Sequence, residues 1–297
     1  MKELIRVSDE VAHALAERRP VVALETTLVA HGFPPGEGVP VGLDSERRVR
    51  EAGAVPATVG VLEGAVRVGL TEDELGRFGP EARKVGPRDL AAAVVQGAIG
   101  ATTVGGTLAA CRTVGIGFMG TGGLGGVHRG FPSPPDVSAD LGELVRTEAL
   151  IVSSGVKSIL DVPATAELLE TLGVPVLGYR TDELPLFYVA RGGPAVSARV
   201  ESAAEAAEIA RAHWRLGRHT SILLGNPAAN SLDDVEPLIE RALADARDLR
   251  IAGQDVTPFV LSYLHRESGG RTLAANRELI AANAALAAEV AVAYAAL

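Results

Sequence analysis

The chain carries few amines that could bond covalently to a substrate. Of its 28 lysine and arginine side chains, only Lys2, Lys84 and Lys157 are lysines. Arginine stays protonated at any workable pH, whereas a lysine amine becomes a nucleophile once it loses its proton. Lys157 lies between the apolar runs ALIVSSGV and SIL, where a solvated surface lysine is uncommon. We predict an amine-specific role for Lys157; the alternative is an ordinary surface charge.

A single carboxylate, Glu25, closes the apolar run VVALE and is followed by TTLVAHG. In α/β sheets, ligands bind beyond the carboxyl ends of the strands. Glu25 therefore stands where a catalytic acid or base is expected. A structural, salt-bridged acid would explain the same position equally well.

The segment 114–144 is rich in glycine and contains a formal GxGxxG over residues 115–120. A dinucleotide site is rejected here, because that motif must open a helix directly and this one runs into GTGGLGGVHRG. Clustered glycines let backbone N–H groups converge on an anion. Ser138 is a good N-cap for SADLGELVR, so we expect free N–H groups at Ser138, Ala139 and Asp140 for a phosphate or ribose hydroxyl. The alternative is a flexible glycine loop.

Asp136 precedes this helix and is a candidate metal ligand. Mg²⁺ and Mn²⁺ are often held by one or two protein oxygens, with waters completing the octahedron. A plain surface carboxylate is the competing explanation. His128 lies nearby in a polar glycine context, and the remaining histidines form no i,i+4 pair, so no zinc site is expected.

Two asparagines, Asn276 and Asn283, fall seven residues apart in the last helical pattern, on nearly the same face as Ile280. An asparagine on an apolar stripe needs hydrogen-bond partners, either buried backbone or a polar ligand.

Strand-like apolar runs alternate with helical patterns, which predicts an α/β fold: a layered α/β/α domain with a central mixed sheet. A hairpin is expected because 65–69 follows 57–62 closely. Helix starts are expected at Thr71 with Glu74, at Ser202 with Glu205, and at Pro163. From Asp233 onward we expect a helical C-terminal segment. The predicted strands are 21–25, 57–62, 114–119, 149–154, 175–179 and 220–225.

Composition narrows the class of protein. With 297 residues, 47% of them hydrophobic, and no linker or repeat, residues 1–297 are expected to form a single domain. A net charge of −9 argues against nucleic acid as a partner. The lone Cys111 suits a reducing cytoplasm, and we find neither a signal peptide nor a charge-free apolar run of membrane length.

These motifs together resemble one family. LETTLVAHGFP, ARKVGPRDL, ATTVGGT, GTGGLGGVHRG, DVSADLGEL, SSGVKSILD, LLGNPA and GGRTLAANRELIAANAA are similar to the pseudouridine-5′-phosphate glycosidases, which include indigoidine synthase A-like proteins. The resemblance runs from about residue 8 to the C-terminus. The departures are small, at Arg271-Thr272 and at Ala282.

The resemblance implies cleavage of pseudouridine 5′-phosphate with water into uracil and ribose 5-phosphate, by a homotrimer that uses Mn²⁺. It implies that Glu25 donates a proton, that Lys157 is the nucleophile and that Asp136 binds the metal. The implied substrate-binding residues are Lys84, Val104, Ser138, Ala139 and Asp140.

The residue types suit this chemistry, because a carbon leaving group has no lone pair for an acid to protonate directly. A lysine that bonds to C1′ of a ring-opened ribose allows cleavage through an iminium. Two alternatives remain: an aldolase-type lyase that uses the same lysine, and a sugar-phosphate sensor in which Lys157 and Glu25 are structural charges.

Overall fold

The central sheet is mixed, as the sequence predicts. The computed structural model describes residues 4–131, 135–251, 253 and 256–297, so Lys2 lies outside the described part. Eleven strands pair in the order β1-β4-β3-β2-β7-β8-β11-β9-β10, with β5 and β6 added beside β3. The pairings are parallel except β3 with β4 and β3 with β6. The strands are β1 (Ile5–Val7), β2 (Val21–Glu25), β3 (Val55–Leu62), β4 (Ala65–Val68), β5 (Arg83–Val85), β6 (Gly100–Thr102), β7 (Phe118–Gly120), β8 (Leu150–Ser153), β9 (Val176–Tyr179), β10 (Ala198–Val200) and β11 (Ile222–Gly225).

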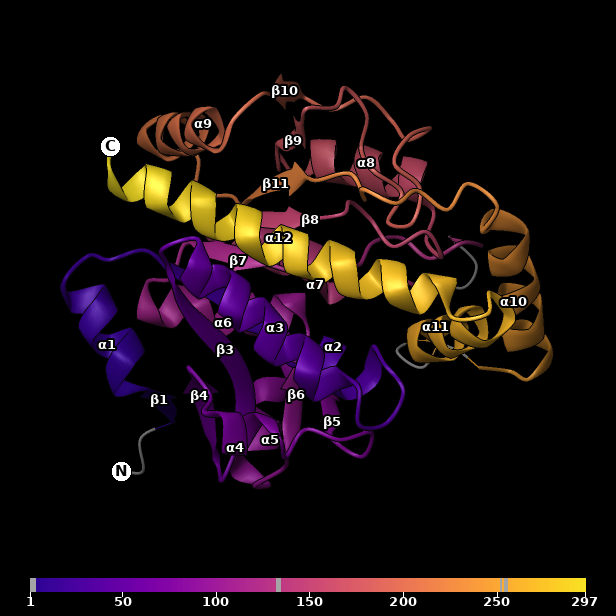
Figure 1. Cartoon of the computed structure of the whole chain (residues 1–297), viewed down its shortest axis with the longest axis horizontal. Helices are drawn as coiled ribbons and strands as arrows, with labels where there is room; N and C mark the ends of the chain where they lie inside the picture. Colours follow the sequence, from indigo (N-terminus) through magenta and orange to yellow (C-terminus); the bar gives the residue numbers. More distant parts are fainter. Residues whose placement is uncertain (1–3, 132–134, 252, 254–255) are drawn as a thin grey trace.

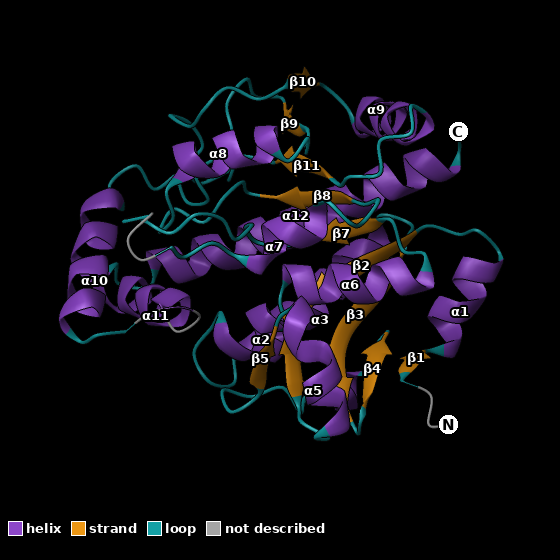
Figure 2. Ribbon diagram, turned by 180° about the vertical axis from the view of Figure 1, so that it is seen from behind, coloured by secondary structure: helices purple, strands orange, loops and turns teal. Residues whose placement is uncertain are grey.

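Helices cover both faces of this sheet, which is why its central strands are apolar throughout. Successive side chains of β2 alternate between the two layers: Val22 and Leu24 join one core, and Val21 and Ala23 join the other. The first layer holds α3 (Gly38–Glu51), α9 (Ala203–Arg215) and the second half of α12 (Arg271–Ala295), seen in front of the sheet in Figure 1. The second layer covers the opposite face of the sheet, which Figure 2 shows from behind. It holds α1 (Asp9–Ala16), α5 (Leu90–Val95), α6 (Val104–Val114), α7 (Ala139–Leu144) and α8 (Val162–Thr171).

The remaining helices are short or lie at one end of the molecule. They are α2 (Thr27–His31), α4 (Glu72–Leu75), the 3₁₀ turn η1 (Pro87–Asp89), α10 (Glu236–Asp248) and α11 (Val256–Glu267). Figure 1 shows α10 and α11 together, beside the N-terminal end of α12. The predicted helical C-terminal segment is confirmed by α10, α11 and α12.

Helix α12 is long and apolar enough to span a membrane by length and composition alone, with a mean hydropathy of 1.4 over its most apolar window. More than half of that window, 56%, is buried inside the chain. The helix packs against β7, β8, α3 and α9, which accounts for its apolar surface.

The six predicted strands all form, with bounds shifted by a few residues, and the predicted hairpin is β3 with β4. The sequence reasoning missed β1, β5, β6 and β10, each three residues long. Three residues carry too little alternation to predict a strand. These strands exist because a neighbouring strand offers its unpaired backbone groups.

Two of the three predicted helix starts are confirmed as expected. Thr71 accepts a hydrogen bond from the Glu74 N–H, and the Glu74 carboxylate accepts one from the Thr71 N–H. Pro163 occupies the first turn of α8, where its missing N–H costs no hydrogen bond, and Asp161 is the N-cap.

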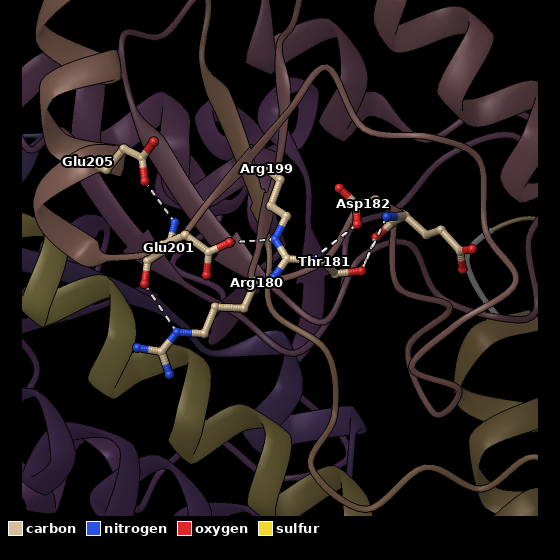
Figure 3. A network of polar contacts seen from close by, with 7 residues as sticks. Arg180, Thr181, Asp182, Arg199, Glu201 and Glu205 are labelled. Carbon is tan, nitrogen blue, oxygen red and sulfur yellow. Dashed lines mark hydrogen bonds and ion pairs between the residues drawn. The ribbon is translucent and has the colours of Figure 1, made fainter.

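The third start, at Ser202, forms only half of the predicted capping box. The Ser202 hydroxyl accepts a hydrogen bond from the Glu205 N–H, but the Glu205 carboxylate accepts from the Glu201 N–H instead. Figure 3 shows that the Glu201 carboxylate in turn accepts from Arg199, which also pairs with Asp182. The bend before α9 therefore brings Glu201, rather than Ser202, within reach of Glu205.

Close packing of α12 on the sheet predicts a specific glycine requirement. A Cβ at Gly120 of β7 would lie 2.9 Å from the Ala284 Cα of α12, whereas at Gly117 its nearest neighbour would be the Glu148 carbonyl oxygen at 3.6 Å. We expect Gly120→Ala to lower the free energy of unfolding by about 1–3 kcal/mol, the usual cost of overpacking. Gly117→Ala is the control and should cost less. Urea unfolding of both variants measures the difference, and equal losses would contradict the prediction.

Candidate active site

The carboxyl ends of β2, β7, β8 and β11 meet at one edge of the sheet, because these strands are parallel neighbours. Glu25, Thr121, Ser154 and Asn226 stand at or just beyond those ends. Strands β5 and β6 run antiparallel to β3 and return toward the same edge. They bring Lys84 to the site from the side of β3, opposite to β7 and β8.

Every residue that the sequence analysis singled out for chemistry or for substrate or metal binding lines one cavity of about 1100 Å³ at this edge. We call it the polar cavity. Its lining also includes Arg88, Asp89 and His128, so charged groups of both signs surround it. The predicted residues that line it are Glu25, Lys84, Val104, Asp136, Ser138, Ala139, Asp140 and Lys157.

Glu25 is almost completely buried, with 5% of its surface exposed. The hydroxyl of Thr121 donates a hydrogen bond to its carboxylate. Burial raises the pKa of Glu25 above its ordinary value, and the charge of Lys157 and the bond from Thr121 oppose part of this rise. A carboxyl group with a raised pKa can carry a proton near neutral pH, which is what a general acid requires.

Lys157 is half-buried and lies in the loop that leaves β8. Its N–H donates to the Leu124 carbonyl at 3.2 Å, and its own carbonyl accepts from the Leu160 N–H at 2.9 Å. Both backbone groups are therefore tied to the glycine-rich segment and to the start of the next turn. Its side chain lines the polar cavity near Glu25, whose pKa responds to the lysine charge.

The prediction of three free N–H groups at the start of α7 is wrong in part. The Ser138 N–H donates to the Gly126 carbonyl, and the Asp140 N–H donates to the Ser138 hydroxyl. The physical reason is that the protein uses both N–H groups itself: the Ser138 side chain caps α7, and the Ser138 backbone pairs with the glycine-rich loop. Its N-cap role is confirmed.

Asp140 has a structural role that the sequence did not predict. It is buried, and its two carboxylate oxygens accept hydrogen bonds from the Gly105 N–H at 2.8 Å and the Gly125 N–H at 3.1 Å. A Cβ at Gly125 would lie 2.6 Å from this carboxylate. The glycine therefore serves close packing, and its N–H binds a protein carboxylate rather than a free anion. Asp140 ties the start of α6, where Val104 lies, to the glycine loop.

Asp136 and His128 lie side by side in the lining of the polar cavity, with 3.6 Å between Asp136 Oδ2 and His128 Nδ1. Burial lowers the pKa of His128, Asp136 opposes this, and Lys84 and Lys157 add to it. Among the described residues, no group of three or more His, Cys, Asp or Glu side chains could hold a metal ion. The donors present fit a largely hydrated ion held by Asp136, and they do not fit a caged site.

A second, apolar cavity of about 480 Å³ adjoins the polar cavity. Phe187, Leu261 and Ile280 contribute apolar walls, and Asn276 lies among them with its side-chain oxygen buried and without a hydrogen-bond partner in the described structure. Phe187 has φ of 65°, a costly conformation for a bulky residue that is maintained only where its surroundings demand it. The two cavities share Glu25, Thr27, Lys84, Lys157 and Thr257.

The other asparagine, Asn283, is fully buried and ties the strand ends together. Its amide donates to the Thr121 carbonyl at 2.8 Å and to the Ser154 hydroxyl at 3.1 Å, and its oxygen accepts from Asn226 at 2.9 Å. The prediction that such an asparagine needs partners is met by the ends of β7, β8 and β11. Through Thr121, this side chain also positions Glu25.

The sequence reasoning missed Arg88, Thr121 and Phe187. Thr121 directly follows the apolar run of β7, so it carries the same strand-end signal that marked Glu25. Arg88 lies four residues after Lys84 in ARKVGPRDL, where the sequence predicts no strand, so no such signal marks it. Phe187 lies in an irregular segment between β9 and β10, where nothing in the sequence marks it.

The fold and site define an α/β protein with a divided ligand cavity at the carboxyl edge of its sheet, containing a lysine and a buried acid. Residues 10–293 match the family described as indigoidine synthase A like protein, and the chain belongs to this family. The resemblance seen in the sequence motifs is thereby confirmed.

Curated relatives extend over nearly the whole chain. The pseudouridine-5′-phosphate glycosidase of Geobacillus kaustophilus is 44% identical, over 98% of this chain and 99% of its own. The protein of the same name from Streptomyces griseus is 48% identical, over 97% of this chain and 92% of its own.

Two solved structures share the fold. The prealnumycin C-glycosynthase AlnA, crystallised with ribulose 5-phosphate, is 42% identical, with a TM-score of 0.89 over 100% of this chain and 98% of its own. An indigoidine synthase A-like protein from Thermotoga maritima is 38% identical, with a TM-score of 0.88 over 98% of this chain and 96% of its own. The predicted layered α/β fold is confirmed by these structures.

The raised pKa of Glu25 predicts a pH-dependent effect on stability. The folded state binds this proton more tightly than the unfolded state, so stability falls as the pH rises from about 4.5 through the folded-state pKa. Glu25→Gln removes that loss. We expect the melting temperature of the variant to gain on the wild type as the pH rises from 4 to 8. Glu167→Gln, at an exposed position of α8, is the control. A constant difference between wild type and Glu25→Gln would contradict the prediction.

Proposed function

We propose that this protein cleaves pseudouridine 5′-phosphate with water into uracil and ribose 5-phosphate, reversibly and in pseudouridine catabolism. One observation carries the proposal: Lys157 and Glu25 lie where the polar and apolar cavities meet. A C-nucleotide has one charged end and one flat, uncharged end. Its glycosidic C–C bond would lie at that junction.

The polar cavity would bind the sugar phosphate. Lys84 and Arg88 supply positive charge, and the turn at Ser138, Ala139 and Asp140 supplies hydroxyl and backbone groups. Val104 is 1% exposed, so its main chain at the start of α6 would be the part that contacts substrate. The related C-glycosynthase binds ribulose 5-phosphate, which is a ligand of the same chemical class.

The apolar cavity would bind uracil. Its walls provide flat and aliphatic surface, and the unpaired oxygen of Asn276 would accept a hydrogen bond from a ring N–H. A buried acceptor without a partner is costly, so a ligand that supplies the missing donor gains specificity.

Lys157 and Glu25 would share the chemistry. The Lys157 amine bonds to C1′ as the C1′–O4′ bond breaks, and O4′ takes a proton from Glu25. The ammonium formed at C1′ then returns a proton to the Glu25 carboxylate, and Glu25 passes that proton to C5 of uracil. The amine lone pair forms an iminium at C1′ as the C1′–C5 electron pair returns to the base. Water adds to C1′, the C–N bond breaks, and ribose 5-phosphate leaves with an aldehyde that closes to the ring.

Asp136 would hold Mn²⁺ in the polar cavity, with water as most of the ligand set and His128 beside it. When bound, the ion would supply positive charge that attracts the phosphate or orients its oxygens. The protein would work as a homotrimer, as the family resemblance implies, and in the cytoplasm, whose reducing conditions suit the lone Cys111.

An aldolase-type lyase and a non-catalytic sugar-phosphate sensor remain alternatives, because either would use the polar cavity. The lyase would release no uracil, and the sensor would form no covalent bond at Lys157.

The central test is Lys157→Arg, which keeps the positive charge but cannot form an imine. With pseudouridine 5′-phosphate and borohydride, the wild type should gain a ribose-phosphate adduct on the peptide that contains Lys157, and ultraviolet absorbance should report uracil release. The arginine variant should gain no adduct and lose turnover, yet still bind ribose 5-phosphate. Trapping on Lys84 would exchange the roles of the lysines. Full activity of Lys157→Arg would exclude the covalent route.

A second prediction concerns the metal. Asp136→Ala should abolish the activation of turnover by Mn²⁺ and weaken Mn²⁺ binding measured by electron paramagnetic resonance, because it removes the carboxylate ligand. Asp89→Ala, which alters a carboxylate elsewhere in the polar cavity, is the control and should keep the Mn²⁺ signal. An unchanged metal response in Asp136→Ala would exclude Asp136 as the ligand.

A further inference from the structure

A groove on the outer surface adjoins the apolar cavity. It encloses about 1100 Å³ between the α2–α3 turn and α11, and its walls include Phe33, Pro34, Pro35, Pro80 and Leu273. We call it the α2–α11 groove. It shares His31, Gly32, Pro258 and Leu261 with the apolar cavity, so the two spaces adjoin at these residues. Figure 1 shows α2 and α11 close together at this end of the molecule.

We infer that the α2–α11 groove is the route by which the free base enters and leaves the site, separate from the opening used by the sugar phosphate. This inference rests on the proposed function. It assigns a role to a surface feature that the catalytic scheme itself does not need.

The groove has the chemistry of a passage for an uncharged planar ring. Among the described residues that line it, none is acidic, and Arg266, which is exposed, is the only lysine or arginine. Prolines and aliphatic side chains dominate it. A phosphate dianion would lose its hydration there without a compensating partner, whereas uracil would lose little. The groove would therefore admit the base and exclude the sugar phosphate.

His265 marks the outer part of this route. Its ring is 9% exposed and stacks on Phe33 with 6.4 Å between the ring centroids. Its Nε2 is buried without a hydrogen-bond partner in the described structure, as is the side-chain oxygen of Asn276 in the apolar cavity. Burial lowers the pKa of His265, which favours the neutral ring. A base with N–H donors and carbonyl acceptors could pair with either atom.

The order of events in the proposed reaction gives this route a purpose. When the C–C bond breaks, the sugar is still bonded to Lys157, and its phosphate still fills the polar cavity. We expect the base to leave before water hydrolyses the iminium, because its departure clears the space beside C1′. A separate opening on the base side lets uracil depart while the sugar stays in place.

Ser262→Trp tests the route, because Ser262 is an exposed residue of α11 that lines the groove and touches neither cavity. Glu267→Trp, on the same helix but outside the groove, is the matched control. Both are made in the Lys157→Arg background, which blocks the chemistry. The enzyme is saturated with ribose 5-phosphate, and association and dissociation of labelled uracil are measured by rapid mixing.

We expect sugar-saturated enzyme to bind uracil. Ser262→Trp should slow association and dissociation by about tenfold or more, with little change in the dissociation constant, because a narrowed passage alters rates alone. Leu261→Ala removes side-chain bulk where the groove adjoins the apolar cavity, so it should speed both steps. Glu267→Trp should change neither. Exclusion of uracil by bound sugar phosphate, or wild-type rates in Ser262→Trp, would overturn the inference. If the enzyme with Lys157 intact does not cleave pseudouridine 5′-phosphate, the proposed function fails, and this route fails with it.

Discussion

The parallel alignment of β2, β7, β8 and β11 is the constraint on which the rest of the structure depends. Parallel strands bring their carboxyl ends to one edge, and the loops that leave them must share the space beyond it. Asn283 stabilises this arrangement by hydrogen bonding to Thr121, Ser154 and Asn226. A single buried amide from α12 therefore ties together the loops that leave β7, β8 and β11, which include the Lys157 loop and Thr121, the hydrogen-bond donor to Glu25.

Burial and charge act in opposite directions on the central acid. Glu25 is removed from water by the sheet and by α12, which favours its protonated form, while the nearby lysine favours the ionised form. The balance between these effects depends on the distance between Glu25, at the end of β2, and Lys157, in the loop after β8. A change in strand packing that altered this distance would change how readily Glu25 holds its proton. The packing that buries Glu25 therefore also sets how tightly this residue holds its proton.

The glycine-rich segment shows how one composition can serve a different purpose from the one expected. Its glycines allow the backbone to approach α12, Phe187 and the Asp140 carboxylate, and several of its N–H groups are used by the protein itself. The charge that could hold an anion comes from Lys84 and Arg88 instead. Lys84 lies in β5 and Arg88 in the 3₁₀ turn η1 that follows it, and both reach the site only because β5 and β6 run antiparallel to β3.

The sequence by itself determined the α/β class, the long strands and most helix starts, because apolar periodicity and capping are local properties. It also picked out Glu25, which closes an apolar run, Asp136, which precedes a capped helix, and Lys84 and Lys157, because lysine is scarce in this chain. Only the tertiary structure decided that these residues surround one cavity and that an apolar cavity adjoins it. The short strands, the unusual φ of Phe187, the unpaired oxygen of Asn276 and the partners of Asn283 depend on contacts between distant segments, which no local pattern encodes.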